Sequence, residues 1–221
     1  MHNVRICELF DTDKTIAKKI FENKEYPWEV LPCIKDFIVE LGKNLPKEIY
    51  DEIKENVWVA KSANVFDSAY IAGPCIIDEN AEVRQCAFIR GSAIIGKNVV
   101  LGNSCEIKNA ILFDNVQVPH FNYVGDSILG YKAHMGAGSV TSNVKSDKTL
   151  VVIKDENEGI ETNLKKVGAM LGDNVEVGCN SVLCPGSVIG RGTTIYPLSM
   201  VRGVVKENSI YKGKNDIVER R

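Results

Sequence analysis

Residues 89–107 read IRGSAIIGKNVVLGNSCEI and place a large apolar residue at every sixth position. The same step runs from Val59 to Phe113 and recurs from Leu171 to Val201. The positions are Val59, Val65, Ile71, Ile77, Val83, Ile89, Ile95, Leu101, Ile107 and Phe113, then Leu171, Val177, Leu183, Ile189, Ile195 and Val201. An α-helix buries residues at a period of about 3.6 and a simple strand at about 2, so neither explains a period of six.

Smaller residues occupy other positions of the repeat. A small or β-branched residue follows each apolar anchor by four, as in Ala81 and Ala87, and glycine often follows it directly, as in Gly96 and Gly102. Six residues suit one short strand and a corner, and three such units close a triangular coil whose stacked copies complete each other's hydrogen bonds. We therefore expect an all-β solenoid, a parallel β-helix. A β-sandwich is the alternative, but its strands vary in length and alternate apolar with polar residues.

The composition excludes several classes of protein. The chain has 221 residues, of which 44% are hydrophobic and 25% charged, as is typical of a soluble globular protein. A nucleic-acid binder normally has an excess of basic residues, whereas the formal net charge here is -2. The sequence contains no apolar run long enough for a membrane helix, and its N-terminal residues show no signal-peptide pattern. The seven cysteines form no C-x-x-C pair and only three histidines are present, so we expect no disulfide framework, no metal site and a cytoplasmic location.

Three segments lie outside the repeat. Residues 1–58 have helical spacing in places, and we expect a small helical cap over the open N-terminal end of a solenoid that spans residues 59–208. Residues 144–170 interrupt the repeat with two β-like stretches around a turn signal, which predicts an inserted β-hairpin arm. Residues 209–221 are polar and basic, and we expect a C-terminal tail there.

The period slips between Phe113 and Asn143, and three motifs lie around the slip. They are EIKNA at 106–110, the H-x-x-Y-x-GD pattern at 120–126 and GAGSVTSN at 136–143. With these motifs, residues 85–205 resemble the acetyltransferase half of the bifunctional glucosamine-1-phosphate acetyltransferases/N-acetylglucosamine-1-phosphate uridyltransferases, which are hexapeptide-repeat acyltransferases. The resemblance implies a left-handed parallel β-helix, a homotrimer with each site between subunits, and acetyl-coenzyme A (acetyl-CoA) as co-substrate. The glycine-rich GxGTR segment of the uridyltransferase half has no counterpart in this sequence.

Acetyl transfer to an amino sugar phosphate needs a base for the amine proton, cations for the phosphate and a donor for the thioester oxygen. Arg90 and Lys108 each follow an anchor and lie 18 residues apart, so the repeat stacks them on adjacent coils. Either a bound anion or a solvated basic face would explain the pair. The resemblance implies a general base at His120 with Asn143 beside it, and coenzyme A binding by Cys179, Pro197 and Arg202. It also implies substrate binding by Arg90, Lys108, Tyr123 and Lys148, with Lys145 as the alternative to Lys148 if the alignment has a gap.

Two residues depart from the family pattern. His134 stands where the family has a substrate-binding asparagine, and Val144 stands where it has a tyrosine. His134 is a candidate substrate-binding residue, with a second base or a surface residue as the alternatives.

The leading prediction is an acetyl-CoA-dependent N-acetyltransferase acting on a phosphorylated amino sugar such as glucosamine-1-phosphate, for UDP-N-acetylglucosamine-type cell-envelope precursors. One alternative is acylation of a nucleotide-linked amino sugar. Another is a non-catalytic trimeric scaffold that binds a sugar nucleotide or a separate nucleotidyltransferase. A metal-dependent hexapeptide protein of the carbonic-anhydrase kind would need three histidine ligands, and only His120 and His134 lie in the repeat.

Overall fold

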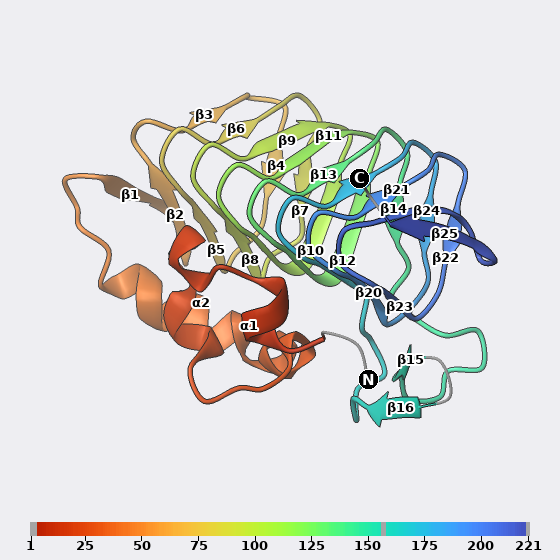
Figure 1. Cartoon of the computed structure of the whole chain (residues 1–221). Coiled ribbons are helices and arrows are strands. Elements are labelled where there is room, and N and C mark those ends of the chain that lie inside the picture. The colour runs from red at the N-terminus through yellow and green to blue at the C-terminus, as the bar shows by residue number, and fades with distance from the viewer. Residues whose placement is uncertain (1–3, 156–157, 220–221) are drawn as a thin grey trace.

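The computed structural model describes residues 4–155 and 158–219 and shows a parallel β-solenoid of about eight coils (Figure 1). Each coil has three faces. Face 1 consists of β2 (Val57–Ala60), β5 (Cys75–Ile77), β8 (Ala93–Ile95), the second halves of β10 (Glu106–Leu112) and β12 (Tyr123–Leu129), β17 (Ala169–Leu171), β20 (Ser187–Ile189) and β23 (Val204–Val205). Face 2 consists of β3 (Asn64–Val65), β6 (Glu82–Val83), β9 (Val100–Asn103), β11 (Gln117–His120), β13 (His134–Met135), β18 (Glu176–Val177), β21 (Thr194–Ile195) and β24 (Ser209–Gly213). Face 3 consists of β4 (Tyr70–Ile71), β7 (Phe88–Ile89), the first halves of β10 and β12, β14 (Val140–Thr141), β19 (Val182–Leu183) and β22 (Met200–Val201).

The apolar anchors fill the interior of the solenoid, as the repeat predicted. From Val83 to Ile107, and again from Leu171 to Val201, each anchor is at most 2% exposed. Phe113 is the exception: Leu112 pairs with Ile95 and takes the anchor position. Phe113 is buried outside the solenoid instead, with its ring 5.3 Å from that of Phe10. The anchor predicted at Phe113 is therefore wrong by one residue.

The coils shorten where the repeat slips. Ile77 pairs with Ile95, eighteen residues on, whereas Ile107 pairs with Val124, seventeen residues on. The missing residue is at the corner where face 3 meets face 1 (the 3–1 corner), because β10 and β12 run through this corner as continuous strands. This corner differs in shape from the ordinary ones and carries the motifs EIKNA and Y-x-GD.

The helices of the N-terminal segment lie along face 1, and its last part reaches the open end of the solenoid (Figure 1). It contains α1 (Ile6–Leu9), α2 (Ile34–Lys43) and the 3₁₀-helices η1 (Thr12–Lys14), η2 (Lys18–Phe21) and η3 (Pro27–Cys33), followed by strand β1 (Tyr50–Lys54), which pairs antiparallel with β2. Helix α2 contacts β5, β8 and β10, and η3 contacts β12. The Leu9 carbonyl accepts a hydrogen bond from the Asp173 backbone at 3.0 Å, so the segment spans several coils. The helices expected over the open end thus form a lateral cover, while β1 covers the edge of the first coil on face 1.

The outward side chains of face 1 explain this position. They are Trp58, Ile76, Ile94, Ile111, Ile128, Met170, Val188 and Val204, all apolar and buried or partly buried. Exposing this row of apolar side chains to water would be unfavourable in free energy, so the N-terminal segment covers it. The signal is visible as doubled apolar residues in CII, AII, AIL, SIL, AML and SVI at 75–77, 93–95, 110–112, 127–129, 169–171 and 187–189.

The last two segments pack on the solenoid. The arm forms a hairpin of β15 (Val152–Asp155) and β16 (Glu158–Glu161), and its buried Val151 and Ile153 side chains lie against Gly186. Strand β24 pairs in parallel with β21, and β25 (Asp216–Glu219) folds back on it. Residues 209–219 are therefore the final coil strand and a closing hairpin and not a separate tail; the rest of the predicted tail, 220–221, lies outside the described residues.

Candidate functional site

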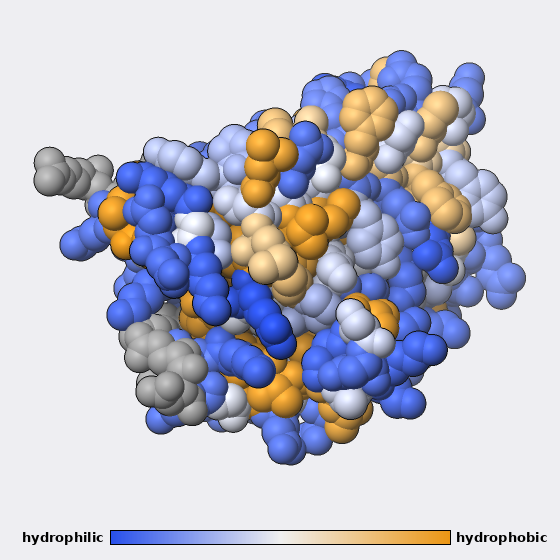
Figure 2. Space-filling model, turned by 90° about the vertical axis from the view of Figure 1, so that its right-hand side faces the viewer, coloured by the Kyte–Doolittle hydropathy of each residue, from blue (hydrophilic) through white to orange (hydrophobic). Residues whose placement is uncertain are grey.

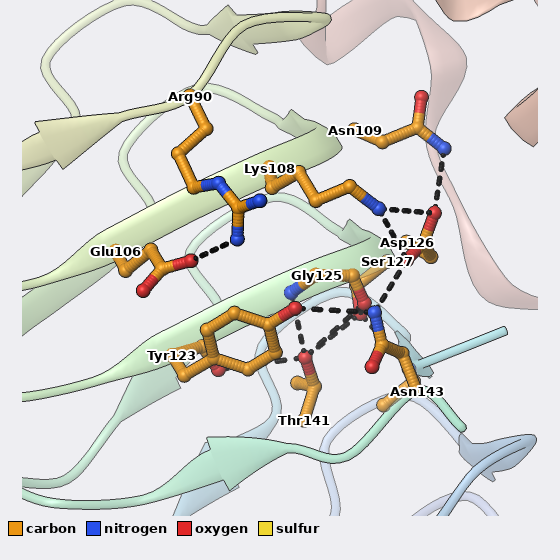
Figure 3. Close-up of polar contacts among 11 residues, drawn as sticks. Arg90, Glu106, Lys108, Asn109, Tyr123, Gly125, Asp126, Ser127, Thr141 and Asn143 are labelled. Carbon is orange, nitrogen blue, oxygen red and sulfur yellow. Dashed lines mark hydrogen bonds and ion pairs between the residues drawn. The ribbon is translucent and has the colours of Figure 1, made fainter. Parts of the chain in front are cut away.

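A cluster of polar side chains lies at the 3–1 corner (Figure 3). Asp126 is at its centre and is only 4% exposed. The Asp126 carboxylate accepts hydrogen bonds from Lys108 Nζ at 3.1 Å, from Asn109 Nδ2 at 2.9 Å and from Asn143 Nδ2. Burying a carboxylate is costly unless such donors satisfy it. The corner is therefore an organised polar site.

The short coils stack the polar residues of this corner. Asn109, Asp126 and Asn143 follow one another at intervals of 17 residues, which is the coil length here. Asn109 and Asp126 each have a backbone φ of 48°, in the left-handed region that asparagine and aspartate tolerate better than most residues. The corner conformation and the polar cluster thus require the same residue types.

Tyr123 extends along β12 towards Asn143 (Figure 3). Asn143 Nδ2 donates a hydrogen bond to Tyr123 Oη at 3.1 Å. A Cβ atom on Gly125 would lie 2.3 Å from Tyr123 Oη, so glycine at this position leaves room for the phenol. Burial, reinforced by the charges of Asp126 and Glu106, raises the pKa of the Tyr123 hydroxyl. The hydroxyl therefore keeps its proton at neutral pH and can donate it in a hydrogen bond.

Arg90 and Lys108 stack on adjacent coils, as the repeat predicted, because Ile89 pairs with Ile107. Each cation has its own carboxylate. Arg90 Nη1 lies 2.7 Å from a Glu106 oxygen, and Lys108 binds Asp126. The Arg90 side chain is still 46% exposed and that of Lys108 25%. Their mutual repulsion is compensated within the chain, so neither a bound anion nor a solvated basic face is required to explain the stack.

His120 lies at a different corner, where face 2 meets face 3 (the 2–3 corner). It ends β11, and its exposed ring contacts the Phe121 ring at 6.4 Å between centroids. Cys179 and Pro197 lie at the same corner of later coils. Backbone hydrogen bonds link these coils in turn, from Gly138 to His120, from Asn180 to Ala137 and from Leu198 to Cys179. The predicted base and two predicted coenzyme A residues therefore lie along the same corner, with Cys179 two coils and Pro197 three coils from His120. Face 3 lies between His120 and Asn143.

The other two candidates lie away from the cluster. His134 is on face 2, and its Nδ1 atom lies 2.7 Å from a Glu176 oxygen. Lys148 is an exposed turn residue of the arm with φ of 57°. The structure does not join either residue to Asp126 or Tyr123. Within residues 4–155 and 158–219, no group of three His, Cys, Asp or Glu side chains is placed to hold a metal ion.

A groove of about 620 Å³ lies between the arm and the 3–1 corner of the later coils. Arg202, the third predicted coenzyme A residue, lines it together with Lys145 and Lys154 of the arm. Val144, Val182 and Met200 provide apolar lining, and Ser142 and Val144 flank Asn143 in the chain. The groove therefore begins beside the polar cluster and continues towards cationic side chains.

Sequence reasoning missed three members of the cluster, namely Glu106, Asn109 and Asp126. The available signal was the 17-residue spacing that relates Asn109 to Asp126 and Asn143, and Glu106 to Tyr123. A search for residues 18 positions apart does not detect this 17-residue spacing.

Comparison with known proteins gives matches to two family models. Residues 71–177 match the GMPPB C-terminal domain, and residues 168–203 match the bacterial transferase hexapeptide (six repeats). The chain is 30% identical over 195 residues to the bifunctional protein GlmU of Methanococcus maripaludis (strain C5), covering 87% of this chain and 47% of the relative. It is 29% identical over 168 residues to a bifunctional sugar-1-phosphate nucleotidylyltransferase/acetyltransferase of Sulfurisphaera tokodaii, covering 67% of this chain and 42% of the relative. A solved mutant of GDP-perosamine N-acetyl transferase from Caulobacter crescentus, in complex with CoA and GDP-perosamine, is 15% identical with a TM-score of 0.31 over 70% of this chain and 51% of that one.

The repeats and the solenoid define a hexapeptide-repeat protein, and the curated relatives support an acyltransferase. The chain resembles the acetyltransferase half of the GlmU proteins and spans about half the length of the curated relatives it matches. Among the helices of the described residues, none is both long and apolar enough to cross a membrane.

Proposed function

We propose that this protein transfers an acetyl group from acetyl-CoA to the amine of a phosphorylated amino sugar, with glucosamine-1-phosphate as the leading acceptor. The polar cluster of the 3–1 corner carries the proposal. It combines the Lys108 cation and the Asn143 amide on one buried carboxylate, with the Tyr123 hydroxyl on that amide and the Arg90–Glu106 ion pair on the adjacent coils. Neighbouring donors, acceptors and cations are the groups that bind sugar hydroxyls, an amine and a phosphate.

In the proposed reaction the amine nitrogen attacks the thioester carbonyl carbon, the C–N bond forms and the C–S bond breaks. His120 removes the amine proton, and the departing thiolate of coenzyme A recovers a proton. His120 suits this role because its ring is exposed and has no hydrogen-bond partner among the described residues. The acceptor then lies across face 3, with its phosphate towards the exposed N–H groups of Arg90 and the amine towards His120.

We assign the acyl donor to the groove beside the arm. Lys154 and Arg202 have no ion-pair partner among the described residues, and Lys145 is 3.3 Å from Asp147. These cations suit the phosphates of coenzyme A, and the apolar lining suits its pantetheine portion. Cys179 and Pro197, at the 2–3 corner, remain candidates for contacts from the opposite side of face 3.

A homotrimer is part of the proposal, because none of the described segments covers face 3 as the N-terminal helices cover face 1. Its outward residues include Tyr70, Phe88, Val182 and Met200, and Met200 is 69% exposed. Figure 2, which views the molecule from the side of its last coils, shows apolar groups exposed between charged ones. Packing face 3 against another copy would bury this surface and enclose the acceptor site.

We place the reaction in the cytoplasm, as a step towards UDP-N-acetylglucosamine-type precursors. All seven cysteines are free thiols, as suits a reducing compartment. The bifunctional relative of Sulfurisphaera tokodaii is named as a sugar-1-phosphate nucleotidylyltransferase together with an acetyltransferase, which supports a sugar phosphate as the acceptor.

A nucleotide-linked amino sugar is the second candidate acceptor. Glu106 and Asp126 already neutralise Arg90 and Lys108, which favours a substrate whose phosphates bind elsewhere. His134 and Val144, which depart from the family pattern, support the same candidate.

Thiol release from acetyl-CoA tests the proposal, with glucosamine-1-phosphate and a UDP-linked amino sugar as parallel acceptors. Calorimetry measures coenzyme A binding by the same preparation. Release with the first acceptor is the expected result, and release only with the second would move the assignment to the second candidate. Absence of both release and coenzyme A binding would refute acyl transfer and favour the scaffold.

Gly125→Ala should raise the acceptor KM at least about tenfold, because the new Cβ atom would displace Tyr123 Oη from Asn143. Steady-state kinetics with a varied acceptor checks this, and coenzyme A affinity should stay unchanged. Tyr123→Phe is the matched comparison, since it removes the hydroxyl without the clash. Equal KM values in the parent and in both variants would show that the Tyr123 hydroxyl does not contact the acceptor.

A further inference from the structure

The contacts of Asp126 determine the orientation of the Asn143 side-chain amide. A carboxylate oxygen accepts hydrogen bonds, so the Asn143 atom that faces Asp126 is the nitrogen. The same nitrogen donates to Tyr123 Oη. Both Nδ2 hydrogens are thus used inside the cluster, and the Asn143 side-chain oxygen has no hydrogen-bond partner among the described residues.

We infer that Asp126 is a positioning residue that holds the Asn143 side-chain oxygen towards the acceptor, so that this position accepts a hydrogen bond from a sugar hydroxyl. The inference rests on the proposed function, since it specifies how the same site recognises its substrate. Lys108 and Asn109 brace the carboxylate from the other side (Figure 3), which fixes Asp126 itself.

The arrangement selects a definite pattern of substrate groups. Tyr123 Oη accepts from Asn143, so its own proton remains for an acceptor atom of the substrate, such as a hydroxyl or phosphate oxygen. Asn143 then holds a sugar hydroxyl at the 3–1 corner while His120 removes the amine proton at the 2–3 corner. This fixes the acceptor across face 3 with its amine at the base, and orientation of this kind contributes strongly to rate.

The direct test is Asp126→Asn, which retains the size of the side chain. In this variant the Asn143 amide can turn around, so that its oxygen accepts a hydrogen bond from position 126. We expect kcat/KM for glucosamine-1-phosphate to fall about 100-fold, with coenzyme A affinity unchanged. The exchange variant Asp126→Asn with Asn143→Asp keeps an N–H···O contact and again presents an acceptor oxygen, so we expect it to recover at least tenfold over Asp126→Asn. Recovery of this kind is not expected if Asp126 serves stability alone.

Asn109→Gly is the graded comparison. It removes one donor from Asp126, leaves the contact with Asn143 in place and suits the positive φ of position 109. Because Lys108 still binds the carboxylate, we expect kcat/KM to fall by less than in Asp126→Asn. An equal loss in Asn109→Gly and Asp126→Asn, or no recovery in the exchange variant, would overturn the inference.

A second readout does not depend on the substrate. In protein labelled with ¹⁵N-asparagine, the side-chain signal of Asn143 is identified by its loss in Asn143→Asp. Both of its hydrogens should exchange slowly in the parent and rapidly in Asp126→Asn. Fast exchange in the parent would refute the positioning role. Slow exchange without turnover of any acceptor would refute the proposed function and leave the positioning intact.

Discussion

Replacing His120 with alanine is expected to lower the rate of acetyl transfer at least about 100-fold, because the amine proton then has no base to receive it. The fold should persist, since the His120 ring is exposed and makes no hydrogen bond to the described residues. Thiol release at saturating acetyl-CoA measures the effect, and calorimetry should show unchanged coenzyme A binding.

His134→Ala is the matched control for that experiment. His134 is also a partly exposed histidine of face 2, but it is paired with Glu176. Its variant should stay within about threefold of the parent rate. If His134→Ala loses the activity and His120→Ala retains it, the base is His134 and the assignment based on the family motif is wrong.

Gly102→Ala is expected to cause the largest loss of stability. A Cβ atom on Gly102 would lie 1.5 Å from the Pro119 carbonyl oxygen, which belongs to the backbone of the next coil. No side-chain rotation relieves this contact, so adjacent coils must separate. We expect the free energy of unfolding to fall by about 3 kcal/mol or more.

Chemical denaturation followed by far-UV circular dichroism measures the effect of Gly102→Ala. Gly213→Ala provides the comparison, because a Cβ atom on Gly213 would meet no atom within 4 Å. It should change the stability by less than about 0.5 kcal/mol. A similar midpoint for the two variants would show that the coils tolerate a wider separation at this position.

The repeat predicted the solenoid because its period reflects a packing requirement that every coil shares. The glycines after the anchors illustrate this. A Cβ atom on Gly96, Gly102, Gly172, Gly178 or Gly190 would come within 3 Å of the backbone of the next coil. Such a constraint is local and periodic, so it is visible in the sequence.

The position of the N-terminal helices was not predicted, because it depends on a surface that forms only when the coils stack. Outward residues on neighbouring strands of face 1 are 16 to 42 residues apart in the chain. They form a continuous apolar row only in the folded solenoid. The same holds for Phe113, whose partner Phe10 belongs to another segment.

The candidate site was predicted in part. The motifs identified Lys108, Tyr123 and Asn143, which the structure brings together around Asp126. Asp126 itself was not predicted, because it acts by accepting hydrogen bonds from Lys108, Asn109 and Asn143. These contacts arise only from the shortened coils. His120 was predicted beside Asn143, but the triangular cross-section places the two residues at different corners.

The cover on face 1 also sets an order of events during synthesis. The backbone N–H of Asp11 donates a hydrogen bond to the Asp173 carboxylate at 2.7 Å, across 162 positions of the chain. A ribosome adding about 5–20 residues per second needs roughly 8–30 s to make that distance. For that time the residues around Asp11 have been made, but the coil that contains Asp173 does not yet exist. Although α2 can dock earlier on β5, β8 and β10, the first residues to be made are therefore among the last to reach their place.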